Sequence, residues 1–389
     1  MRKILIILIL TLTVSGCSSA AGNYLKENKS TLDMNSPDLE LLTPDLADTE
    51  IILAGEYHAV AGNFTAKYGL MTTLHKEAGI RYLLCEMGHG IAGLLNQYME
   101  TGKAETLDFI FEELKGSGAW SIEHREFWER LREYNLQQPK DERIIVIGID
   151  VEHQFRAALY YLTTLNGADE LPLLQDIKLQ DWDDFTNFVF ELQKERANKP
   201  EKYSDALAED LFYFDDVVEN LVNRIAVAEA DQQAMYIREQ AMYENFLKFH
   251  EHLPAGKYFG QFGMAHVFQE QCASDMEGVE RLAMYLQRDD SPVRDQVISI
   301  AYIYINSKMS SWQNDYRELA VQDQFTDTRP VERQASADFT LFKLNSAESP
   351  YAEEPLLIPG PYRGVTTDYF QYVLAIKNSP ATTPYGPWE

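Results

Sequence analysis

Two stretches decide the fold: Ile51-Ile-Leu-Ala-Gly-Glu-Tyr-His58 and Gly260-Gln-Phe-Gly-Met-Ala-His266. Each belongs to a short apolar run of strand type that stops at glycine and is followed by Glu or His. Tyr82-Leu-Leu-Cys-Glu86 and Ile144-Ile-Val-Ile-Gly-Ile-Asp150 end in a similar way. Open α/β sheets bind their ligands outside the carboxyl ends of the strands. We therefore predict an enzyme whose site lies at one rim of a sheet and includes Glu56, His58, Glu86, Asp150 and His266.

Strand and helix patterns alternate along most of the chain, which predicts an α/β fold with a three-layer, mostly parallel sheet. A strand at Ile51–Ala54, an amphipathic helix through about Ala78 and a strand at Tyr82–Cys85 form a βαβ unit. We expect its two strands to be parallel and adjacent. Other predicted elements are strands at Ile144–Ile149, Tyr258–Phe262, Gln296–Ile305, Phe339–Leu344 and Tyr369–Ile376, and a helix at Met276–Gln287.

A long stretch between two predicted strands, from about residue 152 to about residue 255, has a helical pattern and is very acidic. Pro172 and Pro200 are its main breaks. A connection of this length exceeds an ordinary crossover between sheet strands. We predict a large all-helical insertion in an α/β domain that spans residues 39–389.

The first residues have the pattern of a lipoprotein signal peptide over residues 1–16. Arg2 and Lys3 precede an apolar run, and Ser15-Gly16-Cys17 follows it. This run is too short to span a bilayer as a permanent helix. Cys17 resembles the lipidated cysteine of a bacterial lipobox, although a plain signal peptide with a coincidental cysteine is the alternative. Residues 17–38 are polar and predict a tether. We expect a membrane-anchored lipoprotein of the bacterial cell envelope, facing the periplasm from the outer membrane in a Gram-negative cell.

Charge and cysteine content exclude several classes of protein. The chain has 34 Lys and Arg against 61 Asp and Glu, a net charge of −27. Such a surface repels phosphate backbones, so nucleic acid is not an expected partner. Only Cys85 and Cys272 remain after removal of a signal peptide, which excludes a disulfide framework. Cys85 lies inside a buried-strand pattern, which favours an inert thiol over a nucleophile.

Glu56 and His58 are the first candidates for chemistry. Residues two apart in an extended backbone point the same way, so both side chains can face one pocket. A carboxylate beside an imidazole can orient it as a general base. Two alternatives stay open: a shared metal ion, and a turn whose polar groups only satisfy each other.

The other strand ends offer weaker candidates. Glu86 would place a second carboxylate near Glu56, and one of the two would then have a raised pKa or share a cation. Asp150 precedes a helix, so a helix N-cap is its alternative role. His266 follows two glycines and is favoured as a site residue over a core residue. His89 is less certain, because a histidine between glycines is often exposed to solvent.

Several common catalytic motifs are absent from the sequence. It contains no Gly-x-Ser-x-Gly elbow, no Walker loop and no Cys-His zinc spacing. Hydrolysis would therefore depend on an activated water, with His58 or His266 as the base.

The chain resembles the erythromycin esterase family over nearly the whole mature sequence. The motifs that carry the resemblance occur in order: Gly55-Glu56-Tyr57-His58, Leu84-Cys-Glu86, Trp128-Glu-Arg-Leu-Arg-Glu-Tyr-Asn135, Gly148-Ile-Asp150, Arg238-Glu-Gln-Ala-Met-Tyr-Glu-Asn245 and Gly263-Met-Ala-His266. The resemblance implies a hydrolase that cleaves an ester or lactone without a cofactor, macrolide resistance being one setting for such an activity. It implies catalytic roles for Glu56, His58, Glu86 and His266, and substrate binding by Lys67, Asp150 and Arg238.

One departure from that family keeps two other functions open. A single residue separates Glu56 from His58, whereas the esterases have two between these positions. The shorter spacing is similar to that of the ChaN-type haem-uptake lipoproteins and the Tiki group, which includes metal-dependent peptidases. The alternatives are therefore a haem- or metal-binding uptake lipoprotein and a metal-dependent peptidase. If the protein is metal-dependent, a divalent metal would be held by Glu56, His58, Glu86 and His266; haem is the other alternative cofactor.

The lipobox predicts where the protein goes when Cys17 is changed. Cys17→Ser should release the protein from the membrane fraction into the soluble fraction, because the acylated cysteine is its expected hydrophobic anchor. Cell fractionation followed by immunoblotting measures this. Unchanged membrane association would show that another feature of the chain holds it there.

Overall fold

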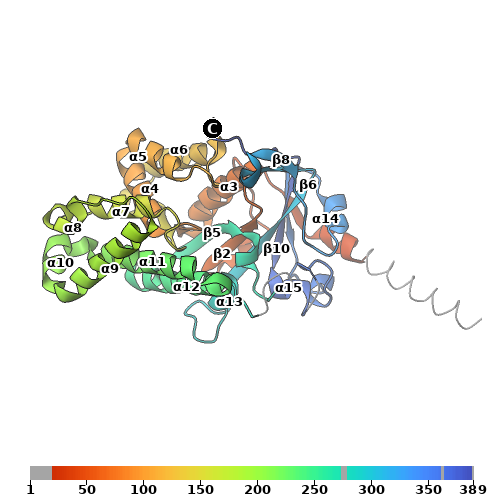
Figure 1. The fold of residues 1–389 in the computed structure, drawn as a ribbon. Helices are drawn as coiled ribbons and strands as arrows, with labels where there is room; N and C mark the ends of the chain where they lie inside the picture. Colours follow the sequence, from red (N-terminus) through yellow and green to blue (C-terminus); the bar gives the residue numbers. More distant parts are fainter. Residues whose placement is uncertain (1–19, 273–277, 361–362, 388–389) are drawn as a thin grey trace, which may run out of the picture. The chain divides into compact units, whose positions relative to one another are not determined.

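The fold is α/β, with eight strands in a mostly parallel central sheet and many helices (Figure 1). A computed structural model describes residues 20–272, 278–360 and 363–387. The predicted signal peptide and Cys17 lie outside these residues. The chain divides into two units: unit 1 contains residues up to 80, 121–127 and those from 257 onward, and unit 2 contains 81–120 and 128–256.

Unit 1 contains most of the sheet, in the strand order β1-β9-β10-β6-β2-β5. Its strands are β1 (Lys29–Thr31), β2 (Ile51–Glu56), β5 (Lys257–Gly263), β6 (Val297–Ile305), β9 (Phe339–Lys343) and β10 (Tyr372–Lys377). The β10–β6, β6–β2 and β2–β5 pairs are parallel, whereas β9 is antiparallel to both β10 and β1. A separate antiparallel pair, β7 (Lys308–Ser311) and β8 (Arg317–Ala320), follows β6.

The predicted adjacency of the first two strands is wrong. Strand β2 pairs with β5 on one side and with β6 on the other, so neither edge is open to the strand that follows it in sequence. The βαβ pattern describes local order only. It carries no information about a strand that arrives about 200 residues later.

Apolar runs explain why the central strands form where they do. Ile51, Ile52 and Leu53 of β2 are completely buried. A continuous apolar run is typical of a parallel strand that is covered on both faces. Helix α3 (Ala61–Ala78) follows β2 and ends at Gly79, whose φ of 67° is left-handed and whose N–H donates to Leu74 O. Glycine adopts this helix-ending conformation without steric cost.

Two sequence-based boundaries need correction. Residues 20–27 are helical, and β1 pairs with β9, so this part of the predicted tether belongs to the folded protein. The helix predicted at Met276–Gln287 is only α13 (Leu282–Leu286), while Met276 lies outside the described residues. Across residues 20–272, 278–360 and 363–387, no helix is long and apolar enough to cross a membrane.

Unit 2 contains the parallel pair β3 (Ile80–Cys85, apart from its first residue) and β4 (Ile145–Gly148). Helices α4 (His89–Thr101) and α5 (Ala104–Glu113) follow β3, and α6 (Ile122–Leu136) begins in unit 1 and ends in unit 2. Every element within the described stretch 152–255 is helical. The α-helices there are α7 (Phe155–Thr164), α8 (Pro172–Gln175), α9 (Trp182–Asn198), α10 (Pro200–Leu207), α11 (Leu211–Glu229) and α12 (Ala234–His252). The helical stretch thus shares its unit with β3 and β4.

Two asparagines bind the backbone at the end of the sheet formed by β4. Asn96 donates to Val146 O at 2.8 Å and accepts from Val146 N at 3.0 Å. Asn135 makes the same two hydrogen bonds to Ile144, at 2.9 and 3.0 Å. Each side-chain amide therefore takes the place of a peptide group on a neighbouring strand. Edge strands whose backbone groups are satisfied in this way are protected from pairing with other chains.

Loss of one of these amides should be costly. Asn135→Ala should lower the free energy of unfolding by about 1–3 kcal/mol, because it leaves backbone groups of Ile144 without partners. Urea unfolding followed by circular dichroism measures the change. Gln137→Ala is the matched control, since this side chain is exposed, and its effect should stay within about 0.5 kcal/mol. Equal effects of the two substitutions would contradict the role of Asn135.

Candidate active site

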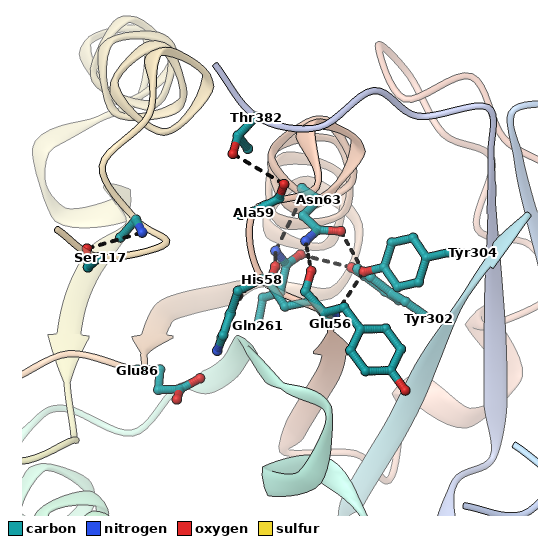
Figure 2. Close-up of polar contacts among 12 residues, drawn as sticks. Glu56, His58, Ala59, Asn63, Glu86, Ser117, Gln261, Tyr302, Tyr304 and Thr382 are labelled. Atoms are coloured by element: carbon teal, nitrogen blue, oxygen red, sulfur yellow. Dashed lines mark hydrogen bonds and ion pairs between the residues drawn. The ribbon is translucent and has the colours of Figure 1, made fainter. Parts of the chain in front are cut away.

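The carboxyl end of β2 carries a histidine paired with a largely buried carboxylate. His58 Nδ1 lies 2.9 Å from Glu56 Oε1 (Figure 2). The Glu56 side chain is 11% exposed, whereas that of His58 is 41% exposed. A carboxylate at Nδ1 favours the tautomer that is protonated there, so Nε2 becomes the basic nitrogen. The pair therefore has the chemistry of an oriented general base.

Glu56 is itself held by residues from the two strands that flank β2. Gln261 on β5 donates from Nε2 to Glu56 Oε2, and Tyr302 on β6 donates to Gln261 Oε1 at 2.9 Å (Figure 2). Burial and the nearby Glu56 charge raise the pKa of Tyr302 well above its ordinary value, so the hydroxyl remains a donor. This chain of hydrogen bonds fixes the carboxylate that orients His58.

A second set of hydrogen bonds fixes the backbone between Glu56 and His58. Asn63, in the first turn of α3, donates to Tyr57 O at 2.7 Å. Tyr304 OH donates to Asn63 Oδ1 at 2.7 Å and accepts from Tyr57 N at 3.1 Å. Figure 2 shows Asn63 and Tyr304 beside the Glu56–His58 segment. The site residues are therefore held through both their side chains and their backbone.

The residue after His58 has an unusual backbone conformation. Ala59 has a φ of 61°, in the left-handed region that residues with a Cβ rarely adopt. Its carbonyl accepts from Ser310 N and Thr382 N, both at 3.0 Å. These bonds from distant segments hold the sharp turn that follows His58. Such strain persists only where the surrounding structure determines it, and it is common at functional sites.

His266 lies on a short 3₁₀ helix, η5 (Met264–Val267), directly after β5, and is buried. This helix packs closely on β2 at Gly55. A Cβ at Gly55 would lie 2.4 Å from Val267 Cγ2 and 2.8 Å from Met264 Sδ. The glycine of the Gly-Glu-x-His motif therefore lets the segment that carries His266 approach the end of β2.

Lys67 is also buried in unit 1, on α3 one turn after Asn63. Its Nζ lies 5.0 Å from the centre of the Phe127 ring. This distance is in the range of a cation–π interaction.

Unit 2 contains a second group of charged side chains, formed by Arg238 of α12 with Asp150 and Glu86. Arg238 donates from Nε to Asp150 Oδ1 at 2.9 Å and from Nη2 to Asp150 Oδ2 at 2.5 Å. The same Nη2 donates to Glu86 Oε1 at 2.8 Å. Asp150 is completely buried, whereas Arg238 and Glu86 are 18% and 15% exposed. Paired with both carboxylates, the guanidinium is held in a fixed orientation.

The charge of Asp150 depends on this partner. Burial alone would raise the pKa of Asp150, but the charge and hydrogen bonds of Arg238 outweigh burial and leave the pKa well below its ordinary value. The N-cap alternative for Asp150 is wrong, because α7 begins at Phe155 and its N-cap is Gln154. Asn220 binds the Asp150 carbonyl at 2.7 Å, which holds the backbone as well.

The predicted site residues are therefore divided between the units. Unit 1 has Glu56, His58, Lys67 and His266, and unit 2 has Glu86, Asp150 and Arg238. Within the units, the structure joins Glu56 to His58, and Arg238 to both acidic residues. The single shared rim, with Glu56 close to Glu86, stays a prediction.

In the part of the chain that the structure describes, no group of three His, Cys, Asp or Glu side chains is arranged to hold a metal ion. The metal-binding role of Glu56, His58, Glu86 and His266 and the haem alternative stay predictions.

Sequence reasoning missed the residues that support Glu56. Gln261 was inside one of the two deciding stretches, and a polar residue in the middle of a buried strand was the available signal. Tyr302 and Tyr304 are two residues apart on β6, so they point to the same face. His89 was a less certain candidate because a histidine between glycines is often exposed, but it is only 3% exposed. Cys85 is buried, as predicted, and neither it nor Cys272 forms a disulfide.

Comparisons with known proteins show a shared fold. No family model and no curated protein matches the chain. The crystal structure of a Bacillus cereus protein has a TM-score of 0.68 at 17% identity, covering 95% of this chain and 99% of that one. A succinoglycan biosynthesis protein has a TM-score of 0.67 at 16% identity, with 95% and 98% covered. A histidine-to-asparagine variant of the erythromycin esterase EreC, in its open conformation, has a TM-score of 0.62 at 14% identity, with 92% and 99% covered.

The buried ion pair of unit 2 predicts a large stability effect. Arg238→Met should lower the free energy of unfolding by about 3–5 kcal/mol, because it leaves the buried Asp150 charge without its partner. The double substitution Arg238→Met with Asp150→Leu should recover most of this loss. Urea unfolding measures both, with Arg196→Met as the control, because the Arg196–Asp215 pair is more exposed and should contribute at most about 1 kcal/mol.

The same pair predicts a dependence on pH. The folded-state pKa of Asp150 is lowered, so its stabilisation is present above the unfolded pKa of about 4 and is lost as the pH falls below that value. Arg238→Met should lose less stability than the unchanged protein over this acidic range. A parallel decline in both proteins would contradict the assignment.

Proposed function

We propose that this protein is a hydrolase that cleaves an ester or lactone by activating water with His58. The Glu56–His58 pair carries the proposal, because a half-exposed imidazole oriented by a fixed, largely buried carboxylate is suited to general base catalysis. The fold shared with the erythromycin esterase EreC supports this choice of substrate class. The short spacing between Glu56 and His58 leaves the identity of the ester open.

The chemistry follows from the two nitrogens of His58. With Nδ1 bound to Glu56, Nε2 accepts a proton from water as the oxygen attacks the ester carbonyl carbon. The imidazolium formed is stabilised by the Glu56 carboxylate. As the tetrahedral intermediate collapses, the C–O bond to the leaving alcohol breaks and the proton passes from Nε2 to the departing oxygen. His266 is proposed to stabilise the developing oxyanion.

The charged group of unit 2 is proposed to bind substrate. The Arg238 side chain is partly exposed, and Asp150 holds its guanidinium in place. A guanidinium in a fixed orientation can donate to a carbonyl or carboxylate oxygen. In this proposal Asp150 is a positioning residue, and Glu86 competes with substrate oxygen for the same guanidinium nitrogen. Lys67 is proposed as a further cation for substrate oxygen atoms, and anchorage through Cys17 rests on the sequence alone.

Hydrolysis assays on p-nitrophenyl esters and erythromycin test this mechanism. His58→Ala should lower kcat by about 10²–10⁴-fold, the usual contribution of a general base. His75→Ala is the matched control, because this histidine lies in the last turn of α3 and not at a strand end. It should leave kcat unchanged. Full activity of His58→Ala would overturn the proposal.

Two further measurements separate the base from a metal site. Glu56→Gln keeps a hydrogen-bonding side chain but removes the carboxylate charge that, in this proposal, stabilises the imidazolium form of His58. It should therefore lower kcat. Treatment with EDTA should leave activity unchanged. Loss of activity with EDTA and recovery with added metal would instead support a metal-dependent peptidase or hydrolase.

A further inference from the structure

Unit 2 contains a cavity of about 670 Å³ that has no role in the proposed hydrolysis. It is lined by residues of α4, β4, α7 and α12 and by the start of α11. All of its lining residues belong to unit 2. Cavities of roughly 300–1,000 Å³ with apolar and aromatic walls are typical of small-molecule sites. The size and location therefore suit a ligand rather than a single water molecule.

One wall of the cavity is a cluster of four rings, formed by His89 and three aromatic side chains around it. The His89 ring is stacked with Tyr213, with centres 5.4 Å apart and planes 9° apart. Tyr161 meets it edge-on at 5.8 Å, and Phe249 lies at 4.6 Å. All four residues line the cavity. Such an arrangement provides a surface on which a flat apolar molecule can pack.

The glycines beside His89 explain why it is buried. A Cβ at Gly90 would lie 2.4 Å from Ala158 Cα of α7, so glycine allows α4 and α7 to pack closely at this point. His89 and Tyr161 are only 3% and 5% exposed. The glycine-flanked pattern that suggested a solvent-facing histidine instead places the ring in a helix–helix contact.

One polar group of this cluster is buried without a hydrogen-bond partner, namely His89 Nδ1. Tyr161 and Tyr213 line the same cavity, and each carries a hydroxyl that can donate or accept a hydrogen bond. Buried polar groups without partners are destabilising and uncommon in folded proteins. The position of His89 at the cavity therefore favours a ligand that supplies the missing bond.

The charges around the cavity favour a neutral ligand. Burial lowers the pKa of His89 to about 3, so its ring is uncharged at neutral pH. Two basic and two acidic residues also line the cavity, namely Lys140, Arg143, Glu100 and Asp210. Opposite charges in equal number give no net attraction for a cation or an anion.

We propose that this cavity binds a small, neutral aromatic molecule that carries at least two hydroxyl groups. Its ring packs against the aromatic wall, and its hydroxyls hydrogen-bond to His89 and to the tyrosine hydroxyls. The site is independent of the proposed hydrolysis, because it uses no residue of the Glu56–His58 pair.

Calorimetric titration of the purified protein with resorcinol tests this site, with toluene as the apolar comparison. Resorcinol should bind at one site with a dissociation constant on the order of 1 mM, and toluene should bind more weakly. Tyr161→Phe and His89→Phe keep an aromatic ring at each position but remove its hydrogen-bonding group. Each should weaken resorcinol binding roughly fivefold, the value of one neutral hydrogen bond.

Two controls make the result decisive. Tyr160→Phe removes a hydroxyl from the neighbouring exposed residue, which does not line the cavity, and should leave resorcinol affinity unchanged. His58→Ala should also leave it unchanged, even if hydrolysis is abolished. Absence of saturable resorcinol binding, equal affinity for toluene, or equal effects of Tyr160→Phe and Tyr161→Phe would overturn the proposal.

Discussion

The site of unit 1 depends on one constraint: a largely buried carboxylate at the end of a parallel strand needs hydrogen-bond donors. Glu56 obtains them from His58 on its own segment and from Gln261 on β5. Tyr302 on β6 then fixes Gln261. Because β2 lies between β5 and β6, satisfying this one charge ties together three strands. The orientation of the histidine is a consequence of that network.

In unit 2, an ion pair stabilises a buried carboxylate. Asp150 is completely buried and keeps its charge because Arg238 binds both of its oxygens. Glu152, two residues later, is also buried but has no such cation among the residues that the structure describes, and burial raises its pKa to about 8. The comparison shows that the partner, rather than burial itself, decides whether a carboxylate remains ionised.

One strained backbone position lies where function is proposed. The left-handed Ala59 directly follows His58, and bonds from Ser310 and Thr382 hold it. These partners are about 250 and 320 residues away along the chain. A reactive side chain on a sharp turn is thus supported by segments that only the complete fold brings near it. Such preorganisation reduces the reorganisation that a general base must undergo during the reaction.

The sequence by itself determined the α/β class, most strands and the pairing of Glu56 with His58, because these depend on local patterns. Apolar runs define buried strands, and residues two apart in an extended segment face the same way. Only the tertiary structure decided that β5 and β6 flank β2, that β1 joins the sheet, and that Arg238 is the partner of Asp150. These contacts join residues far apart in sequence. Which distant groups meet depends on the packing of the whole chain, which no local pattern contains.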